Sequence, residues 1–193
     1  MKRKLKRFCW LIFPILIGMG IVSWADTAKA AEIIVDDQSS GFSRYGTSSY
    51  WKEASIGYNS HMFYTYNGQS AVDNYAIWQP NLSGAGAGTG TYAVSVYIPG
   101  NYADTTNATY TIFHNGANDT RTINQADYTN EWVSLGNFYF STGGSEYVKL
   151  VDKTGEANAT KRVGFDAVKW VKINQLPTAS LSASPLSGTA PLA

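Results

Sequence analysis

The sequence predicts an all-β protein, an antiparallel β-sandwich of the jelly-roll type. Short segments alternate apolar and polar residues, which is the period of a half-buried strand. Clusters of Gly, Asn, Ser and Thr separate these segments about every ten residues. No stretch keeps an apolar helical period for a dozen residues. Short strands with regular turn signals are typical of sandwiches and jelly rolls.

The first 30 residues have the order of a secretory signal peptide. A basic run, MKRKLKR, precedes an apolar stretch at residues 8–24, and Ala28-Lys29-Ala30 follows as a cleavage site. The apolar stretch is shorter than the roughly 20 residues of a spanning helix, and Pro14 interrupts it. We therefore predict a secreted, extracellular protein, free or at the cell surface, that begins at Ala31; the alternative is an uncleaved N-terminal anchor.

Removal of residues 1–30 changes the charge and the cysteine content. Residues 31–193 carry nine basic and 13 acidic side chains, a net charge of −4. A mildly acidic chain without basic clusters argues against nucleic acid and anionic membrane as partners. The single cysteine, Cys9, lies in the predicted signal peptide, so no disulfide, thiolate nucleophile or cysteine zinc site is expected.

The strand signals follow one another from Glu32 onward. TYAVSVYIP at residues 91–99 alternates strictly, and residues 108–124 contain Asn115-Gly116, a strong hairpin signal, between two β-rich runs. Three more strand segments are expected, at residues 131–141, 145–152 and 162–173. The glycine-rich segment at residues 82–90 is predicted to be a mobile surface connection.

Catalytic motifs are lacking, so we expect no catalytic residue and no enzyme activity in this chain. There is no Gly-x-Ser-x-Gly, His-Glu-x-x-His or Ser-x-x-Lys pattern, and no calcium-loop motif. His114, Arg121, Asn124 and Tyr128 are residue types that a polysaccharide lyase site uses, and they surround one predicted hairpin. A lyase-type enzyme therefore stays an alternative, although a half-exposed histidine that bonds turn backbone is the commoner role for His114.

Aromatic residues are abundant in this sequence and are the side chains best suited to bind a ligand. Several lie in segments too polar to be wholly buried: Tyr45, Tyr50, Trp51, Tyr58, Tyr64, Tyr66, Tyr102 and Tyr128. A flat aromatic ring can cover the C–H face of a sugar while neighbouring polar side chains bond its hydroxyls. The candidate ligand-binding residues are Trp51, Tyr58, Tyr102, His114, Arg121 and Tyr128.

Several segments in fixed order resemble a known family. They are IIVDD, YWKEASIGYNSHMFYTYNG, AIWQPNLSGAGAGTGTYAVSVYIP, NATYTIFHNG, INQ, EWVSLGNFYF and FDAVKW. Together they resemble the golvesin C-terminal-like domain, also called the xanthan lyase carbohydrate-binding-like domain. The resemblance implies a β-sandwich module at residues 31–174, appended to secreted bacterial proteins and associated with carbohydrate binding.

The final segment, residues 175–193, has a different composition. It holds no aromatic or charged residue and is rich in Pro, Ser, Thr and Ala. It resembles a linker followed by the truncated start of a PKD domain, an Ig-like sandwich of extracellular bacterial proteins. The alternative is a plain Pro/Ser/Thr linker. The PKD resemblance implies that further domains of a larger polypeptide are partners of this module.

These observations predict a non-catalytic module that binds a polysaccharide or cell-wall glycan, within a secreted modular bacterial protein. The alternative is a structural or adhesive spacer module. We expect no cofactor and no metal site. The alternative is a structural calcium ion at Asp36 and Asp166, which lie in the first and last strand regions. Asp166 shares its strand parity with Val168 and Trp170, so we expect a buried carboxylate that backbone N–H groups or a neighbour satisfy and that ties the terminal strands together.

Overall fold

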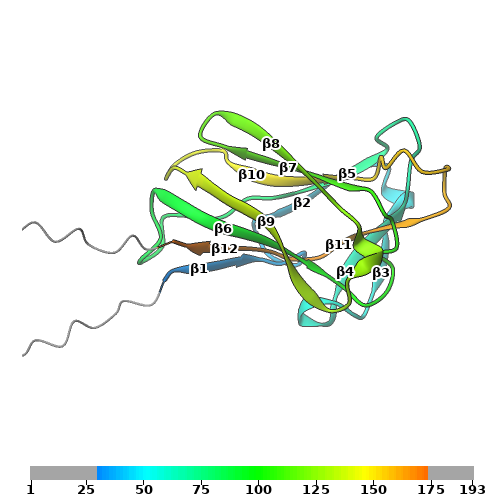
Figure 1. Ribbon diagram of the computed structural model, residues 1–193. Coiled ribbons are helices and arrows are strands. Elements are labelled where there is room, and N and C mark those ends of the chain that lie inside the picture. The colour runs from blue at the N-terminus through cyan, green and yellow to red at the C-terminus, as the bar shows by residue number, and fades with distance from the viewer. Residues whose placement is uncertain (1–29, 174–193) are drawn as a thin grey trace, which may run out of the picture.

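The computed structural model describes residues 30–173, which form an antiparallel β-sandwich (Figure 1). The fold class predicted from the sequence is confirmed. The predicted signal peptide and the PKD-like segment lie outside the described residues. The strands are β1 (Glu32–Val35), β2 (Phe42–Gly46), β3 (Lys52–Ala54), β4 (Met62–Tyr66), β5 (Asn74–Trp78), β6 (Gly90–Ile98), β7 (Ala108–His114), β8 (Ala117–Ile123), β9 (Glu131–Phe140), β10 (Tyr147–Val151), β11 (Arg162–Phe165) and β12 (Val168–Lys172). Three 3₁₀ turns complete the structure: η1 (Ser48–Tyr50), η2 (Tyr58–Ser60) and η3 (Gln125–Asp127).

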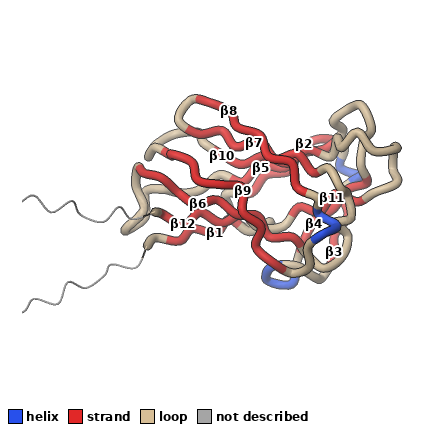
Figure 2. Tube along the Cα trace, in the orientation of Figure 1, coloured by secondary structure: helices blue, strands red, loops and turns tan. Residues whose placement is uncertain are grey.

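Two large sheets form the layers, and a small sheet lies at one end of the sandwich (Figure 2). One layer has the strand order β1-β12-β6-β9 and the other β2-β5-β10-β7-β8. The small sheet has the order β11-β4-β3. Glu32 of β1 pairs with Val171 of β12, so the first and last strands lie side by side. The described chain therefore enters and leaves at the same end of the sandwich, opposite to the small sheet (Figure 1).

The core lies between the two layers and follows the predicted alternation. In β6, Tyr92, Val94, Val96 and Ile98 are buried while the intervening residues are partly exposed. Trp78 of β5 and other large residues fill the centre, and the Trp78 indole N–H donates to the Asp166 carbonyl at 2.7 Å. An indole N–H in a core needs such a partner, because an unbonded buried donor costs free energy.

The β7–β8 hairpin confirms the turn signal read in the sequence. His114 pairs with Ala117, and the two residues between them, Asn115 and Gly116, have φ angles of 46° and 75°. Both central residues of a type I′ turn need positive φ, which asparagine and glycine tolerate best.

The glycine-rich segment at residues 82–90 is attached to the sandwich at several points, among them Lys172 Nζ, which donates to the Ala87 carbonyl at 2.5 Å. Leu82 is buried in the core, and the Tyr92 hydroxyl donates to the Gly88 carbonyl at 2.5 Å.

No helix within residues 30–173 is long and apolar enough to cross a membrane.

Candidate functional site

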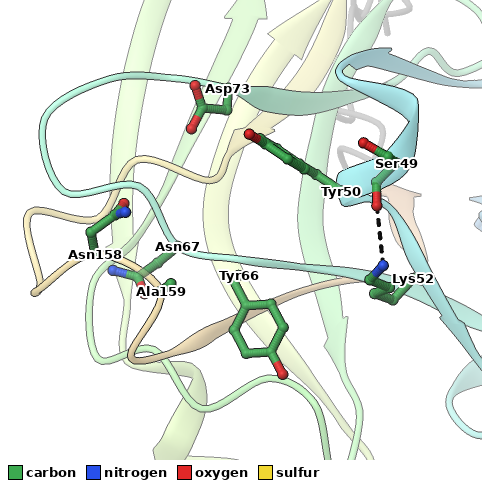
Figure 3. A pocket seen from close by; sticks show the side chains of 8 residues that line it. All are labelled: Ser49, Tyr50, Lys52, Tyr66, Asn67, Asp73, Asn158 and Ala159. Atoms are coloured by element: carbon green, nitrogen blue, oxygen red, sulfur yellow. Dashed lines mark hydrogen bonds between the residues drawn. The ribbon is translucent and has the colours of Figure 1, made fainter.

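A groove of about 370 Å³ lies beside the small sheet (Figure 3). η1, β3, β4, the segments directly after β4 and before β5, and the β10–β11 loop each contribute to its walls. Its lining residues are Ser49, Tyr50, Lys52, Tyr66, Asn67, Asp73, Asn158 and Ala159.

The β10–β11 side of the groove is fixed by one buried amide. The Asn67 side chain is 2% exposed, and its Nδ2 lies 3.1 Å from Thr154 Oγ1 and 3.1 Å from the carbonyl oxygens of Glu156 and Ala157. Its Oδ1 accepts from the Lys161 backbone N–H at 2.8 Å. Because Asn67 bonds both arms of the loop, this wall is held in place before any ligand arrives.

A buried carboxylate holds the part of the groove at Asp73. Asp152 accepts hydrogen bonds from the backbone N–H groups of Asp73 (3.0 Å) and Asn74 (2.8 Å). Burial raises the pKa of Asp152 to about 6, and these two N–H donors oppose that rise. The side chain of Asp73 is left to line the groove.

Two tyrosines supply exposed aromatic rings to the groove. Tyr50 and Tyr66 are each 52% exposed, which is unusual for large aromatic residues. Lys52 donates from Nζ to the Ser49 carbonyl at 3.1 Å, while the Asp73 carboxylate and the Asn158 amide supply further polar groups. Aromatic faces beside hydroxyl-bonding carboxylate and amide groups are the combination that suits a sugar.

The six candidates selected from the sequence do not meet in this groove. Trp51 is half-buried, with its ring centroid 4.8 Å from Phe165 and 6.2 Å from Phe63 in edge-on contacts. Tyr58 packs edge-on against Tyr97 and Trp132 on the outer side of the opposite layer.

The remaining candidates are spread over the molecule. Tyr102 stacks on Tyr64 with a centroid distance of 4.6 Å and lies under the guanidinium of Arg162. Tyr128 packs against the core. Both residues therefore make their own packing contacts, and neither lines the groove.

His114 and Arg121 share the β7–β8 hairpin, and both have protein partners. His114 Nε2 lies 2.9 Å from Asp119 Oδ2, and Arg121 Nε donates to the Leu135 carbonyl at 3.1 Å. These contacts give both residues a structural role that needs no ligand.

Sequence reasoning placed Tyr50 and Tyr66 among the aromatics of polar segments but did not select them. The signal that could have selected them is local: Tyr50 lies in a Ser-rich segment, and Tyr66 ends a strand just before Asn67-Gly68. Aromatic residues next to turns are more often exposed than those in the middle of strands.

Asp166 is the most perturbed carboxylate in the described part of the chain. It is 3% exposed, and the Tyr58 backbone N–H lies 3.2 Å and 3.1 Å from its two oxygens. Burial raises its pKa from 3.8 to about 9, the Tyr58 N–H opposes the rise, and the nearby charges of Asp37 and Asp36 add to it. The carboxylate therefore bonds η2 rather than linking the two terminal strands, which pair through their backbones.

A second buried pair lies close to Asp166. His61 Nδ1 is 2.7 Å from Asp37 Oδ2, and burial raises the pKa of Asp37 to about 6 despite this bond. Among residues 30–173, no group of three or more acidic, His or Cys side chains is arranged to hold a metal ion.

Replacing Asp166 with asparagine is expected to flatten the pH dependence of stability between about pH 4 and pH 9. The unfolded carboxyl has an ordinary pKa of 3.8 and the folded one a pKa of about 9, so its contribution to stability is fully present below the unfolded pKa and falls steadily as the pH rises to the folded pKa. Thermal melts from pH 5 to pH 9 measure it. The parent protein should lose stability across this whole range and Asp166→Asn should lose less; parallel curves would show that Asp166 does not titrate there.

Comparison with known proteins fits this architecture. The structure of a Paenibacillus xanthan lyase matches 74% of this chain with a TM-score of 0.60 and 24% sequence identity, and the match covers 13% of that chain. The two proteins share a fold over one small part of the lyase. A structure of Clostridium thermocellum endo-1,4-β-D-xylanase 10B, with its CBM22-1 and GH10 modules and xylohexaose, matches 72% of this chain and 28% of its own with a TM-score of 0.33 and 14% identity. None of the curated protein sequences is significantly similar to this chain. The profile of the golvesin C-terminal domain matches residues 33–172, well over half of the sequence, and this chain therefore belongs to the golvesin C-terminal domain family.

Proposed function

We infer that this protein is a non-catalytic carbohydrate-binding module of a secreted modular protein, and that the groove at Tyr50 and Tyr66 holds the glycan. The observation that carries this inference is the pair of half-exposed tyrosines beside the Asp73 carboxylate and the Asn158 amide. Two exposed rings in a preformed groove lose little conformational entropy when a sugar stacks on them. Membership of the golvesin C-terminal domain family supports the same function.

The position of the groove suits a binding module better than a spacer. The paired strands β1 and β12 bring the ends of the described chain to one end of the sandwich, whereas the small sheet that borders the groove lies at the other end (Figure 1). A module attached in this way presents its groove away from the rest of the polypeptide. An in-line spacer is better served by ends at opposite poles.

Replacing Tyr66 or Tyr50 with alanine is expected to weaken glycan binding about tenfold, because a stacking contact on a partly exposed ring contributes roughly 1 to 1.5 kcal/mol. The melting temperature should stay unchanged, since half of each ring is already in water. Retention on a panel of insoluble polysaccharides and purified cell wall, followed by titration with the glycan that is retained, measures the effect.

Tyr139→Ala is the matched control. Tyr139 is 45% exposed on β9, in the other layer, and does not line the groove. Full retention by a Tyr50→Ala/Tyr66→Ala double variant would reject the groove as the site. Retention on protein partners alone, with none on any glycan, would reject the function and favour an adhesive module.

A further inference from the structure

The outer face of the five-stranded sheet carries several partly exposed aromatic and aliphatic side chains. In β10, Val148 and Leu150 are fully buried while Tyr147, Lys149 and Val151 point to the other side and are partly exposed. Residues directly opposite one another in a sheet share a face. The register therefore places further apolar residues beside these three, namely Tyr45, Tyr75, Ile77 and Phe113.

Two aromatic pairs stand on this outer face. Tyr45 and Tyr75 stack with a centroid distance of 4.8 Å and an interplanar angle of 12°. Phe113 and Tyr147 lie 5.3 Å apart at 32°. Tyr75 is opposite Val151 and Phe113 is opposite Tyr147. The two pairs are thus separated by about four residues of β10, or roughly 13 Å along the strand.

A single cation lies between the pairs. Lys149 is opposite Ile77 on one side and Thr111 on the other, and its Nζ is 5.8 Å from the centroid of the Tyr75 ring. It is the one charged residue among the strand residues of this outer face, and in residues 30–173 it makes no ion pair with a carboxylate. An unpaired ammonium between aromatic rings is complementary to an anionic ligand with apolar faces.

We propose that this outer face, with Lys149 between the Tyr45–Tyr75 and Phe113–Tyr147 pairs, binds an acidic polysaccharide through its uronate carboxylates. The proposal rests on the inferred glycan-binding function and extends it to a substrate class. The rings cover the C–H faces of sugars that lie along β10, and Lys149 bonds a carboxylate between them. A protein partner fits less well, because the centre of the face is a lysine and a threonine, whereas protein interfaces are depleted of charge at their centre.

The outer face continues into the groove. Asp73 lines the groove and precedes Tyr75 by two residues, and residues two apart on an extended chain point to the same side. One polysaccharide chain can therefore run from Tyr50 and Tyr66 past the Tyr45–Tyr75 pair to Lys149. The groove supplies stacking on Tyr50 and Tyr66, and the outer face supplies the cation that selects for an acidic sugar.

Binding of polygalacturonate and of its fully methyl-esterified form tests this inference, because esterification removes the charge of each carboxyl and adds only a methyl group. The parent protein is expected to prefer the acid form, and Lys149→Gln should lose about fivefold in affinity for it, the effect of one exposed ion pair, with no change for the ester. Lys169→Gln is the matched control, since Lys169 lies over Trp132 on the opposite layer and should leave both affinities unchanged. Tyr147→Ala should weaken binding of both polymers.

The possible failures can be told apart. Equal binding of the acid and ester forms by the parent protein, or an unchanged preference in Lys149→Gln, overturns the acidic-glycan surface and leaves the groove intact as a glycan site. Tyr66→Ala is expected to bind both polymers more weakly while it keeps the parent's preference for the acid form. That result supports a site made of the groove and the outer face. Absence of retention on any glycan by the parent protein overturns the inferred function and this inference together.

Discussion

Gln125→Ala is expected to lower the free energy of unfolding by about 4 kcal/mol. The Gln125 side chain is fully buried, and its Nε2 donates to the Tyr110 hydroxyl and to the Gly164 carbonyl, both at 3.0 Å. Its Oε1 accepts from the Gly164 N–H at 3.0 Å. Truncation leaves both backbone groups of Gly164 and one hydroxyl without a partner in a dry interior, and each unsatisfied group costs about 1 to 3 kcal/mol. Urea unfolding followed by tryptophan fluorescence measures the loss.

Two further variants separate lost hydrogen bonds from lost volume. Gln125→Met fills nearly the same space without polar atoms, so it should be almost as unstable as Gln125→Ala. Tyr110→Phe removes one of the three bonds and should cost about 1 kcal/mol. Near-complete recovery of stability in Gln125→Met would mean that a cavity, and not the Gly164 bonds, accounts for the effect.

The bond between Gln125 and Gly164 shows what the sequence could and could not predict. The alternation of β6 and the Asn115-Gly116 turn are local signals, and both elements form where the sequence places them. A polar residue inside the core has no such signal, because Gln125 bonds Gly164, which lies 39 positions further along the chain and comes close only through folding. The hydrophobic pattern thus predicts the layers, while the buried hydrogen bonds that fix one layer against another depend on tertiary contacts.

The candidate site was harder to predict for the same reason. Trp51 and Tyr50 are adjacent and share a polar segment, yet Trp51 packs against Phe165 and Tyr50 is 52% exposed. Which of two neighbouring aromatics faces water is decided by η1, a single 3₁₀ turn that no periodicity indicates. Asn67 illustrates the point again, because its role in fixing the groove comes from loop residues about 90 positions away in sequence.

Trp51→Ala is expected to lower the free energy of unfolding by about 3 kcal/mol, the low end of the range for truncating a large aromatic residue, because the ring is only half-buried. The indole packs edge-on against Phe63 and Phe165, and the guanidinium of Arg44 lies 5.5 Å from its centroid. Removing it exposes the two phenylalanines and removes one of the two rings over which Arg44 lies. Thermal and urea unfolding measure the loss.

Glycan titration of the same variant, well below its melting temperature, decides between packing and recognition. If Trp51 is a packing residue, Trp51→Ala should bind glycan within about twofold of the parent, and Trp51→Phe should recover most of the stability because a smaller ring still covers Phe165. Tyr66→Ala should show the reverse pattern, with a normal melt and weak binding. A Trp51→Ala variant with an unchanged melting temperature and no glycan retention would instead place Trp51 in the recognition surface, as its polar sequence neighbours indicate. The inferred glycan site would then lie nearer to Arg44 than to Tyr50 and Tyr66.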